Sequence, residues 1–207
     1  MSRTRKTNVK KLVLCGIFIA IIIVLTAVPY TGYITYLPGG TPITTLHIPV
    51  ILGALFLGWK YGALLGGVWG ITCVVKAFLN PDPANVPFQN PLVSVLPRII
   101  VGAVAALVFA LCSGKFKKQK DRSGRGLPTP VSACIATVAG TLTNTLLVLT
   151  ALHLFGHLGT TTIAALFSTV LMTLVGINGI IELAAAVVIV TALYSALAKT
   201  YHERFEA

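Results

Sequence analysis

The sequence predicts an all-α integral membrane protein, a bundle of six transmembrane helices. The first observation that predicts a membrane protein is the composition. Of the 207 residues, 56% are hydrophobic and 10% are charged, and the mean hydropathy is +0.89. Soluble domains carry roughly a quarter charged residues, so this composition indicates a chain surrounded by lipid. A span takes roughly 20 apolar residues, and six such runs fit the chain. We therefore expect residues 1–207 to form a single membrane domain, without a separate soluble one.

The position of the basic residues supports this fold and orients it. They gather in two clusters that border apolar runs, although the formal charge of +11 also suits a nucleic-acid partner. Basic loops stay in the cytoplasm, so we expect both clusters and both termini there. Attraction to anionic lipid explains the same charges without a nucleic acid. The clusters are Arg3, Arg5, Lys6, Lys10 and Lys11, and then Lys115, Lys117, Lys118, Lys120, Arg122 and Arg125.

The apolar runs define the expected helices in order. The first follows the basic tail, shows no cleavage site of a signal peptide and ends at Pro29, so we expect it to be retained. The second is short and follows a loop rich in glycine, proline and tyrosine. The third carries glycines three and four residues apart, a spacing that lets helices approach closely in lipid. The six spans are expected at about residues 11–28, 46–58, 61–79, 91–111, 131–154 and 176–198.

The last third of the chain is harder to divide. Residues 163–198 are too long for one helix and awkward for two. Two full spans would place the C-terminus outside the cell, against the charge bias. We therefore expect residues 163–175 to be re-entrant or interfacial, with the sixth span following them.

Ionisable groups inside spans are costly and usually face the interior of a bundle. Arg98 and Glu182 are both expected in the outer half of the bilayer, where they share one pocket or simply pair with each other. Asn178 lies one helical turn before Glu182, and Asn144 lies in the polar half of the fifth span. An arginine offers bidentate recognition of a carboxylate or phosphate, so this set favours a binding site for an anion.

Other ionisable groups lie in or beside the expected spans. His47, at the start of the second span, lines the outer vestibule or is a plain interfacial residue. Lys76 is near the outer end of the third span and is expected to extend to the membrane surface. His153 and His157 are four residues apart, but no third metal ligand is evident. We therefore expect neither a metal nor a cofactor.

Motifs of membrane and soluble enzymes are missing from the sequence. It contains no H-E-x-x-H, no G-x-S-x-G and no phosphate-binding loop for ATP hydrolysis. The sequence therefore favours a binding protein over an enzyme. Two other classes stay open, namely an intramembrane enzyme that uses Glu182 with a histidine, and a structural subunit without a ligand.

The chain resembles the substrate-binding (S) components of energy-coupling factor (ECF) vitamin transporters. The resemblance covers nearly the whole chain and rests on the six-helix plan, the stretch TPITTLHIPVILGALFLGWKYGALLGGVWGI and the stretch QNPLVSVLPRIIVGA. It implies a vitamin-binding protein that docks on a membrane coupling subunit (T component) driven by two cytoplasmic ATPase subunits. It also implies a contact with that subunit through a small-xxx-small motif in the first helix, here Gly16-x-x-x-Ala20.

Among such vitamins, the details are most similar to pantothenate carriers. Arg98 would hold the carboxylate, and Glu182 would orient Arg98 or accept a hydroxyl. Trp59 and Trp69 are expected to lie away from the pocket, which favours a non-aromatic ligand over riboflavin, although a pyrimidine or a queuine-like compound stays possible. The substrate-binding residues expected are Arg98, Asn144, Asn178, Glu182, Thr141, His47 and Tyr36.

Overall fold

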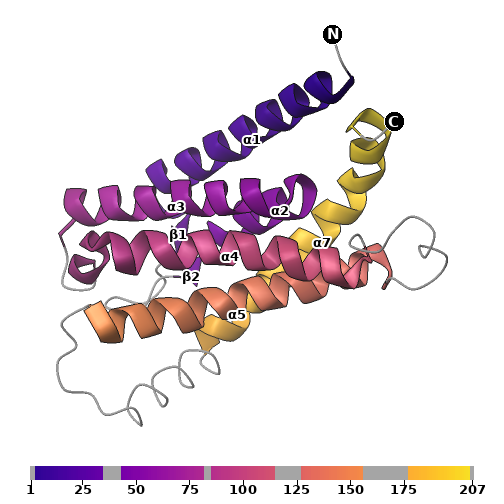
Figure 1. Cartoon of the computed structure of the whole chain (residues 1–207). Helices are drawn as coiled ribbons and strands as arrows, with labels where there is room; N and C mark the ends of the chain where they lie inside the picture. The colour runs from indigo at the N-terminus through magenta and orange to yellow at the C-terminus, as the bar shows by residue number, and fades with distance from the viewer. Residues whose placement is uncertain (1–2, 35–42, 82–84, 115–126, 156–176, 206–207) are drawn as a thin grey trace.

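A computed structural model describes residues 3–34, 43–81, 85–114, 127–155 and 177–205, with side chains for 9–33, 44–81, 85–114, 127–155 and 179–201. Helices run roughly side by side in one bundle (Figure 1). The elements are α1 (Arg3–Ala27), β1 (Tyr33–Ile34), β2 (Ile43–Thr44), α2 (His47–Leu57), α3 (Trp59–Leu79), the 3-10 helix η1 (Val86–Gln89), α4 (Pro91–Cys112), α5 (Thr129–Phe155) and α7 (Ile177–Phe205).

The expected all-α membrane fold is confirmed. Apart from one hairpin of two-residue strands, the regular elements of the described chain are helices, and five of these helices are long and apolar enough to cross a bilayer. The start of α1 and the end of α7 lie on the same side of the bundle in Figure 1. The assignment of that side to the cytoplasm stays a prediction. The segment 163–175 lies outside the described residues.

The short helix α2 is central to the bundle. Each of its 11 residues is buried, and it packs against α1, α3, α4, α5 and α7. Eleven residues extend about 16 Å, roughly half of the hydrocarbon thickness of a bilayer. Before its first residue the chain forms the hairpin, in which Tyr33 pairs with Thr44 in antiparallel register.

The hairpin gives a reference point for the direction of the helices α2, α4, α5 and α7. Helices α2, α4 and α7 begin near it and run away from it, whereas α5 runs back toward it, since Leu127 N–H donates to the Cys112 carbonyl at the far end of α4 (3.0 Å). We call the two ends of the bundle the hairpin end and the tyrosine end. The tyrosine end is defined by Phe56, Phe109, Tyr194 and Tyr201.

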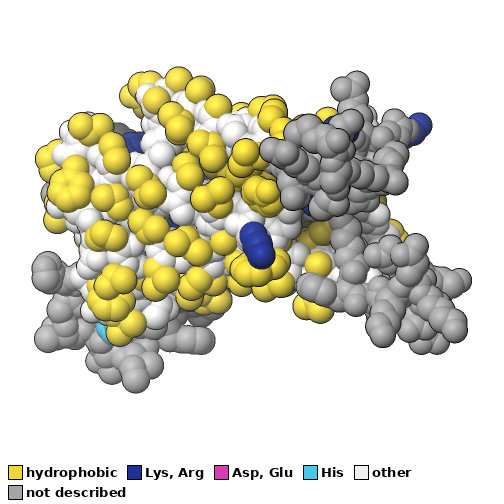
Figure 2. Space-filling view, turned by 45° about the horizontal axis from the view of Figure 1, so that its top comes forward, with side chains coloured by type: hydrophobic (Ala, Val, Ile, Leu, Met, Phe, Trp, Pro, Cys, Tyr) yellow, Lys and Arg dark blue, Asp and Glu magenta, His cyan; other side chains and the backbone are white. Residues whose placement is uncertain are grey.

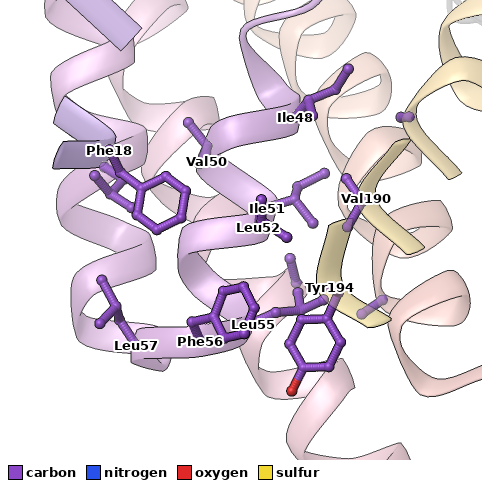
Figure 3. Close-up of a cluster of buried hydrophobic side chains, with 14 of the residues drawn as sticks. Phe18, Ile48, Val50, Ile51, Leu52, Leu55, Phe56, Leu57, Val190 and Tyr194 are labelled. Atoms are coloured by element: carbon purple, nitrogen blue, oxygen red, sulfur yellow. The ribbon is translucent and has the colours of Figure 1, made fainter. Parts of the chain in front are cut away.

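Aromatic rings close the tyrosine end. The ring of Phe56 lies 4.6 Å from that of Tyr194 and 5.0 Å from that of Tyr201, and Phe109 meets Tyr194 edge-on at 5.1 Å. The Tyr201 hydroxyl donates to the Phe56 carbonyl (2.8 Å), one of the last carbonyls of α2, which has no partner within its own helix. Figure 3 shows Phe56 and Tyr194 in the same apolar cluster as Ile51 and Val190. The C-terminal half of α7 is thereby joined to the end of α2.

Glycines allow α3 and α4 to pack with their backbones in contact. A side chain at Gly66 would overlap the backbone carbonyl of Arg98, and Gly62 and Gly102 would each meet the backbone of the other. This is the most extensive helix pair of the described chain. The glycine spacing of the third span thus serves the close approach that small residues permit in lipid. It also fixes the height of Arg98 in the bundle.

Hydrophobic side chains cover most of the described surface in the view of Figure 2. Helix α1 contributes strongly, since Leu12, Val13 and Ile17 are all more than half exposed. A surface of this kind suits hydrocarbon rather than water. The chain is a multi-pass membrane protein.

Candidate functional site

Four helices bring one polar residue each to the hairpin half of the bundle. The floor beneath them is a tight contact at Gly140 of α5, where an added Cβ would lie 3.1 Å from Ile51 of α2 and 3.3 Å from Ala105 of α4. Ala186 of α7 is buried in the same core. Toward the hairpin, each helix carries a polar residue on the same face as its floor residue. His47, Asn144 and Glu182 lie one helical turn from the floor, and Arg98 lies two turns from it.

The side chain of Arg98 is positioned by a carbonyl that the preceding residue, Pro97, leaves free. Proline has no N–H, so Pro97 leaves the carbonyl of Val93 without its helical partner. The Nη1 of Arg98 donates to that carbonyl at 2.8 Å. The guanidinium is thereby drawn back along α4 toward the hairpin end, where it is only 7% exposed.

Two aromatic rings cover the guanidinium of Arg98. It lies 5.2 Å from the ring of Trp69 on α3 and 5.5 Å from the ring of Phe88 in η1. The short helix η1 is fastened above α4 and α3, since Ser94 Oγ donates to the Phe88 carbonyl (2.5 Å) and Gln89 Nε2 to the Ala77 carbonyl (3.1 Å). The expectation that Trp69 lies away from the site is therefore wrong. Its ring contacts the arginine, and the argument against a flat aromatic ligand loses that support.

Glu182 does not pair with Arg98. Within the described residues its carboxylate Oε1 accepts the backbone N–H of Thr44 in β2, at 2.5 Å. The carboxylate therefore fastens the hairpin to α7. The sequence left open whether Arg98 and Glu182 share a pocket or pair with each other. Within the described residues the two side chains form no ion pair, although both lie at the hairpin end.

Several buried polar atoms in this half of the bundle have no hydrogen-bond partner within the described residues. They are both ring nitrogens of His47, the Nε1 of Trp69, the Nε of Arg98, the hydroxyl of Thr141 and the amide oxygen of Asn144. His47 is only 1% exposed. Buried polar groups in native proteins are nearly always hydrogen-bonded, and each one that is not calls for an explanation. These atoms are available to a polar ligand.

The threonines of α5 differ in a way that singles out Thr141. The hydroxyls of Thr137, Thr143 and Thr145 each donate to the carbonyl four residues earlier, at 2.8, 2.7 and 3.3 Å. Such back-bonding satisfies a hydroxyl within its own helix. Thr141 is 5% exposed and makes no such bond. Of the two buried threonines of α5, Thr137 and Thr141, only Thr141 has a hydroxyl that the helix leaves for another partner.

The sequence missed a cluster on α3. Trp69, Cys73 and Lys76 lie on one helix face, and the Tyr33 hydroxyl is 3.0 Å from Cys73 Sγ. The Nζ of Lys76 lies 3.5 Å from the centroid of the Tyr33 ring, so the partly buried Lys76 contacts the hairpin. Burial raises the pKa of the Tyr33 hydroxyl. The i, i+4, i+7 spacing was the available signal, but the loop residue that packs on it was not foreseeable.

The remaining expected residues lie elsewhere or outside the described part. Tyr36 lies outside the described residues, as does the side chain of Asn178, whose backbone is in the first turn of α7. Gly16 and Ala20 lie on the exposed face of α1, and nothing lies within 4 Å of a Cβ placed on Gly16. Across the described residues, no three histidine, cysteine or acidic side chains are grouped as a metal site.

Comparison with known proteins matches residues 10–194 to the family described as "ECF transporter, substrate-specific component". The pantothenic acid transporter PanT of Lactococcus lactis subsp. cremoris is 33% identical over 94% of this chain and 97% of its own length. The pantothenate transporter PanT of Leuconostoc mesenteroides subsp. mesenteroides is 28% identical over 91% of this chain and 92% of its own length.

Proposed function

Because the chain belongs to the substrate-specific components of ECF transporters, we propose that it is the pantothenate-binding subunit of an ECF importer. The names of the two similar PanT proteins support this ligand. Pantothenate carries a carboxylate at one end, an amide in the middle and two hydroxyls at the other end. A site for it needs one cation and several uncharged donors and acceptors.

Arg98 is the observation that carries the proposal. A buried cation in a membrane bundle is costly unless an anion or a set of acceptors compensates for it. Here the guanidinium donates to a single carbonyl, has no carboxylate partner within the described residues and is covered by two rings. The carboxylate of the ligand completes its environment through charge-assisted hydrogen bonds.

The uncharged end of the ligand is assigned to α2 and α5. The unpartnered atoms of His47, Thr141 and Asn144 lie on the hairpin side of the floor, as Arg98 does, and include both donors and acceptors. They suit the amide and the hydroxyls of pantothenate. Asn178 and Tyr36 are assigned to the same ligand from the sequence alone.

Glu182 is assigned a different role from the one expected. We propose that its carboxylate holds the hairpin against α7 through Thr44, so that it closes the site and does not contact Arg98. An intramembrane enzyme that uses Glu182 would need a second catalytic group beside it. The transporter family of the chain argues against such an enzyme.

Import also needs partners. We propose that the chain docks on a membrane T component driven by two cytoplasmic ATPase subunits, with both of its own termini in the cytoplasm. The exposed face of α1 around Gly16 and Ala20 suits this contact, because small residues let a neighbouring helix approach closely.

The first prediction tests the ligand. The purified protein in detergent is titrated with pantothenate by calorimetry, and the small molecules that co-purify are identified by mass spectrometry. We expect one tight site per chain in the wild-type protein. Arg98→Ala should weaken binding about 100-fold, because it removes charge-assisted hydrogen bonds in a dry site.

The control is Lys60→Ala, which removes an exposed cation at the opposite end of α3 and should leave the affinity unchanged. A wild-type protein that binds no pantothenate, or that co-purifies with riboflavin or a pyrimidine, would contradict the proposed ligand. Unchanged affinity in Arg98→Ala would contradict the role of the arginine.

A further inference from the structure

A second cation lies in the same aromatic cluster as Arg98. The Nζ of Lys76 is 3.5 Å from the centroid of the Tyr33 ring, within the range of a cation–π interaction. The Tyr33 hydroxyl in turn lies 3.0 Å from the Sγ of Cys73, one turn before Lys76 on α3. These contacts hold the ammonium group at the base of the hairpin.

Tyr33 connects the two cations. Arg98 lies over Trp69, one turn before Cys73 on the same face of α3. Burial and the neighbouring Cys73 raise the pKa of the Tyr33 hydroxyl, and the positive charge of Arg98 opposes this rise. In geometry, Arg98 lies over Trp69, and the Tyr33 hydroxyl lies against Cys73, one turn further along the same face of α3. The ring that Lys76 covers therefore packs on the same helix face as Arg98.

Neither cation has a counter-ion within the described residues. Lys76 contacts the ring of Tyr33, and Arg98 contacts a carbonyl and two rings. The carboxylate of Glu182 at this end accepts the N–H of Thr44. An anion that reaches both groups compensates both charges.

We infer that Lys76 and Arg98 bind the carboxylate of the ligand together, with Tyr33 as an aromatic wall beside it. This inference rests on the proposed function and adds a specificity-determining residue to it. Arg98 supplies the directional hydrogen bonds of its planar group, and Lys76 supplies a second point charge. The pair makes the site selective for an anion over a neutral compound of the same shape.

The test compares two ligands that differ only at the charged end. Pantothenate is measured beside panthenol, the alcohol in which a CH2OH group replaces the carboxylate, by calorimetry on the full-length protein in detergent. Lys76→Met removes the charge and keeps an unbranched side chain. We expect the Kd for pantothenate to rise about tenfold or more and that for panthenol to change by less than about threefold.

Two variants serve as controls. Lys76→Arg keeps the charge and should retain most of the affinity for pantothenate. Lys60→Met is the matched control on the same helix, because Lys60 also lies over a tryptophan ring, that of Trp59 at 5.7 Å, but at the opposite end of α3. It should alter neither affinity. If Lys76→Met is not monodisperse in size-exclusion chromatography, Lys76→Gln takes its place.

The outcomes separate this inference from the proposed function. Wild-type binding of pantothenate that Lys76→Met leaves unchanged overturns the inference and leaves the proposed function standing. An equal loss for both ligands also overturns it, since Lys76 then only supports the packing of Tyr33. A wild-type protein that does not bind pantothenate overturns the proposed function itself.

Discussion

At the tyrosine end, the Tyr201 hydroxyl satisfies a helix-terminal carbonyl, and stacked rings from α2, α4 and α7 fill the remaining space. At the hairpin end, the same three helices and α5 bury polar atoms that have no partner in the described chain. Isolated hydroxyls elsewhere, those of Ser113 and Thr191, also lack partners. Only at the hairpin end of the described chain do a guanidinium, an imidazole, an amide and a hydroxyl each contribute a buried atom without a partner.

The difference indicates that the tyrosine end mainly stabilises the fold and the hairpin end mainly binds the ligand. Polar groups left unpaired in a buried place lower stability, and proteins retain such groups where function needs them. The tyrosine end and the glycine contact between α3 and α4 supply the packing that tolerates this cost. Variants at the tyrosine end should therefore change stability without affinity, and variants at the hairpin end should change affinity without loss of stability.

The largest effect on stability is expected for Phe56→Ala. Phe56 contacts both Tyr194 and Tyr201, so its removal opens a cavity between α2 and α7. We expect a loss of about 2–4 kcal/mol, mainly from lost van der Waals contacts, since these hold helices together in lipid. The measurement is thermal unfolding in detergent, followed by tryptophan fluorescence. Leu64→Ala, at an exposed position of α3, is the control and should change stability little.

The proposed difference between the two ends is wrong if Phe56→Ala reduces the free energy of ligand binding as much as it reduces the free energy of unfolding. Calorimetry at a temperature where the variant is folded gives the affinity. We expect this to be unchanged, because Phe56 lies more than two turns from His47 along α2.

A smaller effect is expected for Thr141→Val, at the other end. The substitution keeps the shape of the side chain and removes the hydroxyl that α5 leaves unpaired. We expect the affinity for pantothenate to fall about fivefold to tenfold, the equivalent of one neutral hydrogen bond. The melting temperature of the ligand-free protein should stay the same or rise, because a buried unpaired group is removed.

Thr143→Val is the matched control for Thr141→Val. Its hydroxyl donates to the Ala139 carbonyl at 2.7 Å within the helix, so its removal should leave the affinity unchanged. Equal losses of affinity in the two variants would mean that the unpaired state of Thr141 has no bearing on the ligand.

The sequence was a good guide to the fold and to the polar groups of the hairpin end. Hydrophobic runs indicate spans because lipid forces backbone groups to pair within each helix, and charges inside those spans are rare enough to be noticed. Arg98 was identified in this way. Even its hydrogen bond follows from the sequence, since Pro97 frees the carbonyl of Val93.

The partners of these groups were not predictable in the same way. Lys76 was expected at the membrane surface because long basic side chains near helix ends usually extend there. Its contact with Tyr33 was not foreseeable, because the hairpin brings that residue to α3 from more than 40 residues earlier in the chain. Glu182 likewise meets a backbone N–H, that of Thr44, which has no side-chain signature. Both contacts depend on how a loop folds onto the bundle.

The smallest effect is expected for Tyr201→Phe. The ring stays beside Phe56 and only the hydrogen bond to the Phe56 carbonyl is lost. We expect a decrease in stability of about 1 kcal/mol, the net value of one neutral hydrogen bond, and no change in affinity for pantothenate. Thermal unfolding and calorimetry on the same preparation measure both quantities. A variant that keeps its stability but loses affinity would mean that the tyrosine end communicates with the hairpin end through α7, and the division between the two ends would then be wrong.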